Sequence, residues 1–222
     1  MAFILNIETA TKNCSVCLAK DGVAVAVAEY AGEGYAHAEK LHVFIEDVLR
    51  EAKITFKDLS AIAVSMGPGS YTGLRIGVSA AKGLCYALNI PLIAIETLEL
   101  LARKISIQEG VIISMIDARR MEAYTAVFDK EYTKLRDTKA EILVSDSFME
   151  LSGTLHLVGD GAAKCREVLV SDRFVYHDIM YPSSVEMATI SFDKFKKSDT
   201  VDVAYFEPFY LKDFIISGKN QN

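Results

Sequence analysis

Residues 65–84 read SMGPGSYTGLRIGVSAAKGL, and five of these twenty residues are glycine. The stretch follows an apolar run at 61–66 that is typical of a buried strand, and it continues as a helix to about Leu88. A glycine turn between a strand and a helix directs backbone N–H groups at an anion. Glycines spaced four residues apart within a helix are instead typical of close contact between two backbones. The stretch therefore indicates either a nucleotide site or a packing surface.

The known phosphate-binding motifs do not fit this stretch. A P-loop requires a lysine after its second glycine, and the stretch has none in that place. A dinucleotide-binding G-x-G-x-x-G also fails, because the last position counted from the first glycine is a threonine. The start of the helix remains a weak anion site. Its candidate residues are Gly67, Gly69, Ser70 and Thr72.

The packing alternative rests on two helices. A glycine inside a helix costs about 0.5–1 kcal/mol relative to alanine, so two of them in one helix require a compensating contact. The helix expected at 37–52 carries Val43 and Phe44 outside the apolar stripe that one core face needs. From pattern alone, a helix bundle between two chains and simple cover for the chain's own sheet remain equally open. The smooth stripe of the second helix consists of Gly73, Gly77, Ala80 and Ala81.

The chain contains an internal repeat. An apolar run that ends in an acid occurs at 3–8 and again at 111–117. With the two acids aligned, CSVCL at 14–18 falls on AYTAV at 123–127 without a gap. The strand, glycine turn and helix around residues 61–84 also recur, more weakly, further along the chain. Such self-similarity predicts two related halves.

Each half follows the order β-β-β-α-β-α, and the halves meet near residue 105. This order predicts an α/β fold of the superfamily of actin, Hsp70-type chaperones and sugar kinases (ASKHA), with a reduced second half. We expect one subdomain at 1–105, which carries the two helices of interest, and a second at 106–222. A polar link is expected at 31–35, and Thr97 is the expected N-cap of a following helix.

Composition limits the classes of function. The formal charge of −6 opposes direct binding of nucleic acid by the chain alone, and its basic residues are dispersed along the sequence. The N-terminus lacks the features of a signal peptide, and no apolar run approaches the ~18 residues of a membrane helix, so we expect a cytoplasmic protein with no membrane partner. Cys14 and Cys17 fall on opposite faces of one expected strand, which favours buried thiols over a metal or redox pair.

The residues available for catalysis are few. In ASKHA enzymes the first hairpin holds phosphate through an acid followed by glycine, whereas residues 8–11 here read ETAT. His37 and His42 are five residues apart, so they cannot face one metal ion from a single helix. These features argue against an independent ATP-dependent enzyme and against a metallopeptidase. A charged turn remains, which binds an anion or a partner or is simply solvated: Asp117, Arg119, Arg120 and Glu122.

The motif GPGSYTGLRIGVSAAKGL resembles the signature of the TsaB (YeaZ) family, usually written GPGSFTGLRIG…AKGL, with tyrosine in place of phenylalanine. The resemblance extends along the chain. ILNIETATKNCSVCL at the start, HAEKLH at 37–42, DARRMEAY at 117–124 and PFYLKDF at 208–214 are similar to the family's patterns. Glu8 stands where the family has aspartate, and Ala38 where it has serine.

The resemblance implies a non-catalytic subunit of the bacterial machine that makes N6-threonylcarbamoyladenosine (t6A) beside the anticodon of tRNA. It implies a heterodimer with the catalytic paralogue TsaD through the first two helices, self-association through the same surface, and addition of the ATPase TsaE. ATP or ADP and metal are then expected on partner subunits, and tRNA only through the complex. The expected partner interface comprises His37, Leu41, Val43, Phe44, Gly73, Arg75, Gly77, Ala80, Ala81 and Leu84. On this view Gly77→Leu should keep the fold and lose the partner.

We predict that the isolated chain does not turn over ATP, because the first hairpin lacks the glycine that brings a backbone close to phosphate. Phosphate release by rigorously purified protein should stay at the level of a buffer blank. ATPase activity that disappears on substitution of Glu8 or Thr9 would contradict this expectation.

Overall fold

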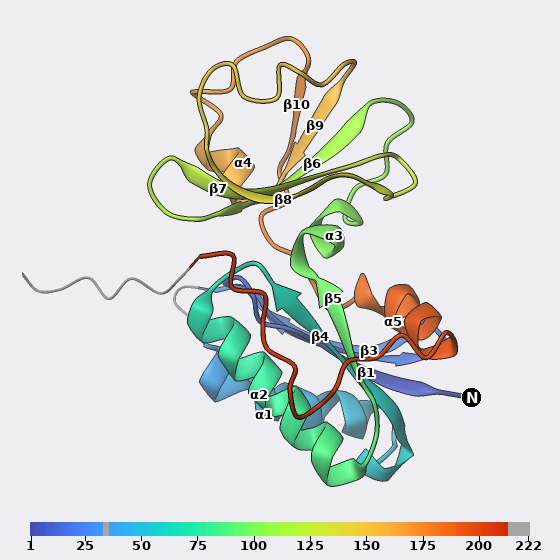
Figure 1. Cartoon of the computed structure of the whole chain (residues 1–222). Helices are drawn as coiled ribbons and strands as arrows, with labels where there is room; N and C mark the ends of the chain where they lie inside the picture. The colour runs from blue at the N-terminus through green and yellow to red at the C-terminus, as the bar shows by residue number, and fades with distance from the viewer. Residues whose placement is uncertain (33–35, 213–222) are drawn as a thin grey trace, which may run out of the picture.

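The computed structural model describes residues 1–32 and 36–212 and contains two five-stranded sheets, one above the other in Figure 1. The expected link at 31–35 lies partly outside the described residues, as do the last two residues of PFYLKDF. The first half holds β1 (Phe3–Glu8), β2 (Cys14–Lys20), β3 (Val23–Tyr30), α1 (His37–Glu51), η1 (Phe56–Asp58), β4 (Leu59–Gly67), α2 (Tyr71–Leu88), β5 (Leu92–Glu96) and α3 (Thr97–Ala102). The rest holds β6 (Val111–Asp117), β7 (Glu122–Phe128), β8 (Lys134–Ile142), β9 (Leu155–Val158), α4 (Asp160–Lys164), β10 (Phe174–His177) and α5 (Met187–Lys196).

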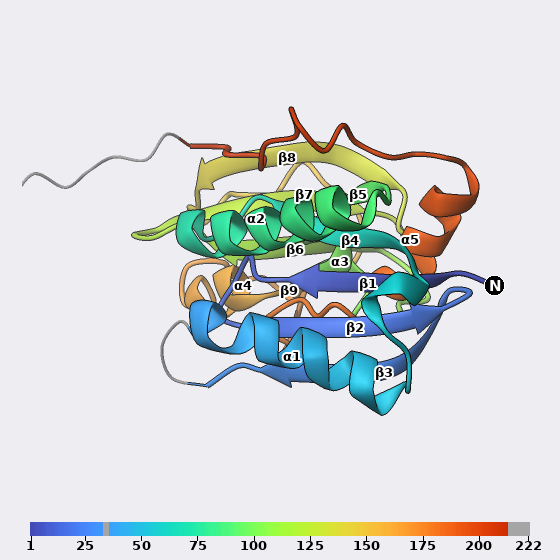
Figure 2. The same ribbon diagram turned by 90° about the horizontal axis from the view of Figure 1, so that it is seen from below.

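The first sheet has the order β3-β2-β1-β4-β5. β1 pairs antiparallel with β2 and parallel with β4. The β2–β3 turn is Asp21-Gly22 with φ of 49° and 86°, as this dipeptide predicts for a hairpin. α1 and α2 lie next to each other across one face of the sheet, as Figure 2 shows. Their apolar stripes meet the inward residues of β1, β2 and β4 in one core that includes Leu41, Val78 and Ile62.

The second sheet repeats this topology. Its order, β8-β7-β6-β9-β10, is that of the first sheet with each strand replaced by its counterpart. Glu8 ends β1 and Asp117 ends β6, as the alignment of the two acids predicted. The described residues between β8 and β9 form turns where the first half has α1, and α4 has 5 residues where α2 has 18. The predicted ASKHA-type duplication with a reduced second half is therefore present.

The end of the chain returns to the first half. α5 packs on the face of the first sheet opposite α1 and α2, where Met187 and Ile190 join Ile4 and Ile93 in a core cluster. Residues 201–212, which we call the C-terminal strap, then run along α2 in the direction opposite to the helix (Figure 1). The stretch 106–222, expected as one subdomain, thus contributes two elements to the packing of the first half.

The strap is attached to α2 and its sheet at several points. Val201 forms a bridge with Leu92 at the edge of β5. The Lys82 ammonium donates hydrogen bonds to the carbonyl oxygens of Ala204 (3.1 Å) and Phe206 (2.9 Å). Nearer the other end of α2, the backbone N–H of Phe209 donates to the Met66 carbonyl at 2.7 Å. These bonds satisfy the polar backbone of a segment that has no sheet of its own.

Two local expectations have different outcomes. Cys14 and Cys17 are both buried free thiols of β2, as predicted, and burial raises their pKa to about 11 and about 12. The N-cap prediction for Thr97 is wrong, because Glu96 occupies the cap and Thr97 is the first residue of α3. No helix of the described residues is long and apolar enough to cross a membrane.

Candidate functional site

The glycine stripe of α2 faces the interior of this chain. Gly73, Gly77 and Ala81 are all buried. A Cβ added at Gly73 would lie closer than 3.0 Å to the Thr9 carbonyl oxygen, and one added at Gly77 would collide with the Thr9 hydroxyl. The compensating contact that the two glycines require is therefore intramolecular. This corrects the expectation that these three residues meet a partner.

The loop that packs against these glycines is Thr9–Asn13, between β1 and β2. Hydrogen bonds to three other residues hold it in place. The Thr9 hydroxyl donates to the Gly73 carbonyl at 2.8 Å. The Ser70 N–H donates to the Ala10 carbonyl at 2.7 Å. His37 Nε2–H, from the first turn of α1, donates to the Thr11 carbonyl at 2.8 Å. Two carbonyl groups and one hydroxyl group of the loop are thus bonded to α1, α2 and the turn before α2.

Glu8, the acid before this loop, is fully buried. Its Oε1 accepts a hydrogen bond from the Ala10 N–H at 2.6 Å, and its Oε2 has no hydrogen-bond partner among the described residues. Burial raises the pKa of Glu8 to about 8, against the opposing effect of the Ala10 hydrogen bond. A neutral, inaccessible carboxyl group at pH 7 is suited to structure and not to holding a metal–phosphate complex.

Most of the residues after β4 that were candidates for a weak anion site are packed against, or hydrogen-bonded to, other parts of the chain. A Cβ at Gly67 would lie within 3.0 Å of the Phe209 carbonyl oxygen of the strap, and one at Gly69 would meet the Ala10 carbonyl. The Ser70 hydroxyl caps α2 by accepting from the Gly73 N–H at 3.3 Å. Thr72 alone among the four is exposed. Close backbone packing accounts for the glycines of this turn.

The remaining expected interface residues are divided between the interior and the surface. His37 and Leu41 are buried on the side of α1 that faces the sheet. Phe44, Ala80 and Leu84 are half-buried at the margin of the core. Val43 is 52% exposed on α1, and Arg75 is exposed on α2. The surface open to a partner is therefore the outer face of the two helices.

On that outer face the structure reveals a residue that was not singled out from the sequence. Gly83 is exposed, and no heavy atom of the described chain outside its own turn of helix lies within 4 Å of the position a Cβ would take. Ser79 and Ala87 lie four residues before and after it and are also exposed. Tyr86, one turn from Lys82, is 86% exposed. The available signal was helical spacing, because Gly83 lies far around the helix from the buried Gly73, Gly77 and Ala81.

The charged turn between β6 and β7 is built from ion pairs. The Asp117 carboxylate pairs with the Lys164 ammonium, which also donates to the Glu122 carbonyl. The Glu122 carboxylate pairs with Lys212 at the end of the strap. Arg119 and Arg120 lie at the exposed tip. The structure thus brings together all four residues of this turn and adds cations from two distant segments.

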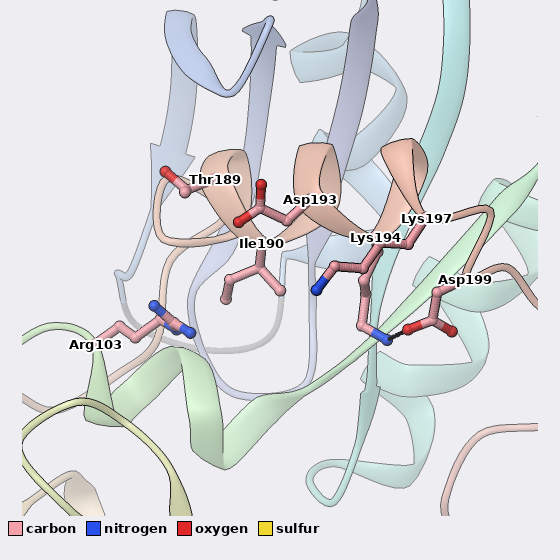
Figure 3. Close-up of a pocket in the computed structure, with 7 residues that line it drawn as sticks. All are labelled: Arg103, Thr189, Ile190, Asp193, Lys194, Lys197 and Asp199. Carbon is pink, nitrogen blue, oxygen red and sulfur yellow. Dashed lines mark hydrogen bonds and ion pairs between the residues drawn. The ribbon is translucent and has the colours of Figure 1, made fainter.

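A pocket of about 280 Å³ lies between the end of α3 and α5, away from these residues (Figure 3). Ile190 points into it, and its charged rim is mostly paired, with Lys194 bound to Asp199 at 2.6 Å and Arg103 bound to Glu99 at 2.8 Å. Among the described residues there is no group of three histidine, cysteine, aspartate or glutamate side chains placed to hold a metal ion. We find no arrangement for catalysis in this pocket.

Comparison with known proteins identifies a consistent set of relatives. A family model described as TsaD, tRNA N6-adenosine threonylcarbamoyltransferase, matches residues 33–213. The tRNA threonylcarbamoyladenosine biosynthesis protein TsaB of Escherichia coli (strain K12) is 31% identical over 219 residues, 94% of this chain and 94% of that protein. TsaB of Bacillus subtilis (strain 168) is 32% identical over 79% of this chain and 71% of that protein. A tRNA N6-adenosine threonylcarbamoyltransferase of Bacillus thuringiensis (strain Al Hakam) is 36% identical over 108 residues, 42% of this chain and 32% of that protein.

Solved structures agree on the fold. YeaZ from Pseudomonas aeruginosa superposes with a TM-score of 0.83 at 23% identity, covering 95% of this chain and 100% of that chain. The activator of 2-hydroxyisocaproyl-CoA dehydratase from Clostridium difficile, solved with bound ADPNP, has a TM-score of 0.50 at 12% identity, with coverage of 89% and 97%. These likenesses confirm the predicted fold class.

The position of Gly77 predicts that Gly77→Leu destabilises the isolated chain. The new side chain must displace the Thr9 loop, and overpacking of this kind costs about 1–3 kcal/mol. For a chain of this size the melting temperature should fall by roughly 2–12 °C. The matched control is Gly83→Leu, which makes the same change on the open face and should leave the melting temperature at or above that of the unmutated chain. Equal melting of the two variants would contradict the assignment of inner and outer faces.

Glu8 predicts a specific pH dependence of stability. Between its ordinary pKa of 4.5 and its folded value of about 8, the unfolded chain releases a proton that the folded chain keeps, so the free energy of unfolding must fall as pH rises through this window. Glu8→Gln removes this loss. Relative to the unmutated chain, the variant should gain a few kcal/mol between pH 5 and pH 8, since each pKa unit is about 1.4 kcal/mol. Urea unfolding at both pH values measures the gain, and the exposed Glu51→Gln should show none.

Proposed function

Because the chain belongs to the TsaB family, as the motif resemblance predicted, we propose that it is the non-catalytic subunit of a bacterial t6A-synthesis complex that binds and supports a TsaD-type transferase. Three observations on the first hairpin support a role without catalysis. Glu8 is buried and neutral at pH 7, and the loop after it is hydrogen-bonded to α1 and α2 of the same chain. The loop also lacks the glycine that follows the acid in ASKHA enzymes.

Gly83 is the observation that carries the partner assignment. A glycine in the middle of an exposed helix costs about 1 kcal/mol relative to alanine, and nothing in the described fold compensates for it. The absence of a side chain at Gly83 would allow a partner helix to approach closely. Ser79, Ala80 and Ala87 lie three or four residues from Gly83 on α2 and extend a strip of small residues, which suits helix-to-helix packing at short distance.

The transferase relative supports a paired arrangement. This chain is 36% identical over 108 residues to a protein that carries the transferase name, so the two are homologous over part of their length. Related folds present related helices, and a helix face that pairs with its own copy can pair with the corresponding face of a paralogue. The outer α1–α2 face therefore forms the heterodimer interface. Where the transferase paralogue is absent, the same face forms a homodimer interface.

The other parts of the complex complete the proposal. A TsaE-type ATPase joins the heterodimer, and ATP or ADP and the metal ion are held by the partner subunits. The substrate tRNA is bound by the assembled complex. The buried Glu8 and the occupied glycine turn after β4 support placing nucleotide chemistry outside this chain.

Gly83→Leu tests the partner assignment. The branched side chain should hold the two helices apart and weaken binding roughly ten- to a hundredfold, because overpacking costs about 1–3 kcal/mol and each 1.4 kcal/mol is tenfold in affinity. The variant should fail to co-elute with the TsaD-type paralogue of the same organism. It should also fail to restore t6A, measured by mass spectrometry of tRNA nucleosides, in cells that lack this gene.

The control is Ala163→Leu, which adds a larger apolar side chain at an exposed position of α4, on the second half. It should co-elute normally. If Gly83→Leu also co-elutes and restores t6A, the outer face of α2 is not the interface.

A further inference from the structure

Three segments that are far apart in sequence meet at one edge of the molecule. The Tyr71 ring at the start of α2 packs against the Tyr210 ring of the strap, with centroids 4.9 Å apart. The Arg75 guanidinium lies 4.6 Å from the Tyr71 ring centroid. Two residues beyond Tyr210, Lys212 pairs with Glu122 of the β6–β7 turn. The strap thus connects the start of α2 to that turn.

The cations of this edge outnumber the free acids. Arg75, Arg119 and Arg120 are all exposed. The neighbouring carboxylates are already engaged, Asp117 by Lys164 and Glu122 by Lys212. Neither arginine of the turn has an ion-pair partner within residues 1–32 and 36–212. A protein with a formal charge of −6 therefore gathers unpaired positive charge in this place.

The backbone of the turn shows that its two arginines are held at a cost. Arg119 and Arg120 have φ of 70° and 50°, both in the left-handed region. Asp117 pairs with Ala123 and the Ala118 N–H donates to the Glu122 carbonyl, so the turn is the three-residue loop Arg119-Arg120-Met121. L-residues other than glycine lose of order 1 kcal/mol or more in the left-handed region. Because glycine or asparagine would adopt these φ values at lower cost, the long cationic side chains themselves are the feature that this turn supplies.

We propose that the edge formed by Arg119 and Arg120 binds the phosphate backbone of the tRNA on which the complex acts. The proposal rests on the proposed function, which supplies the RNA. Guanidinium groups match phosphate oxygens in two-point hydrogen bonding. A single small phosphate would need a cradle of free N–H groups, whereas the Ser70 and Gly73 N–H groups at the nearby start of α2 are already bonded.

The test uses the complex of this chain with its TsaD-type paralogue and measures tRNA binding as a function of salt. Arg119→Glu with Arg120→Glu should weaken binding by roughly tenfold or more at physiological salt. Loss of two phosphate contacts should also reduce the slope of log K against log salt by about 1.4–1.8. The control reverses the same charge at Lys57 and Lys130, which are exposed on distant loops. Equal loss in the control would mean that net charge alone is responsible, and the edge would be rejected.

A second variant separates binding from folding. Arg119→Asn with Arg120→Gly replaces both arginines by residues that adopt a positive φ at lower cost, so the melting temperature should stay the same or rise while tRNA binding falls. If this variant binds tRNA as tightly as the unmutated complex, the proposal is overturned.

Two further measurements identify the ligand and distinguish a failure of this proposal from a failure of the proposed function. Inorganic phosphate and ATP at millimolar concentration should not compete with tRNA for the edge, and competition lost in the arginine variants would assign it to a small phosphate instead. Co-elution of each variant with the paralogue is recorded in the same samples. Failure of the unmutated chain to co-elute would reject the proposed function, and arginine-dependent binding of tRNA to the chain alone at low salt would then still support the edge.

Discussion

The contact between the Thr9 loop and the glycine side of α2 organises the first half of the molecule. Without side chains at Gly73 and Gly77, the helix approaches the loop closely enough for the Thr9 hydroxyl to bond the Gly73 carbonyl. The same loop receives His37 from α1 and the Ser70 N–H from the turn after β4. Any added volume at this contact must move α2, and with it the exposed outer face of the helix, away from the end of β1.

This contact also explains why an ASKHA-type fold lacks the usual phosphate hairpin. The loop after β1 contains no glycine and is bonded to the chain's own helices, and burial raises the pKa of Glu8 to about 8. The outer faces of α1 and α2 are consequently held in a fixed arrangement by interactions beneath them. A rigid, smooth surface of this kind suits recognition by another folded chain, since little conformational entropy is lost on binding.

Both halves pack glycines closely against the end of their first strand, but the second half covers the following turn less completely. In the second half, a Cβ at Gly159 or Gly161 would crowd the end of β6, just as one at Gly69 would crowd the loop after β1. The second half has no counterpart of α1 in the described chain, and its helix α4 is short. Its β6–β7 turn therefore stays open, and the strap reaches it through Lys212. The duplication thus produced one covered hairpin and one exposed hairpin.

Much of the architecture was predictable because it depends on local periodicity and turn chemistry. The apolar runs of β1 and β2, the Asp21-Gly22 hairpin, the two long helices and the repeat that aligns Glu8 with Asp117 are all properties of short segments. The burial of Cys14 and Cys17 followed from their spacing on a strand. The TsaB resemblance likewise rested on contiguous motifs.

Only the tertiary structure decided which smooth side of α2 is internal. Helical spacing makes a stripe of Gly73 and Gly77 and another that passes through Gly83, and both satisfy the same small-residue pattern. The choice depends on where the Thr9 loop lies, which no spacing within the helix encodes. Glu122 and Lys212 meet for the same reason, because this contact joins the β6–β7 turn to the strap across 90 positions of sequence. Local sequence determines the faces of each element, and long-range packing determines which face remains for function.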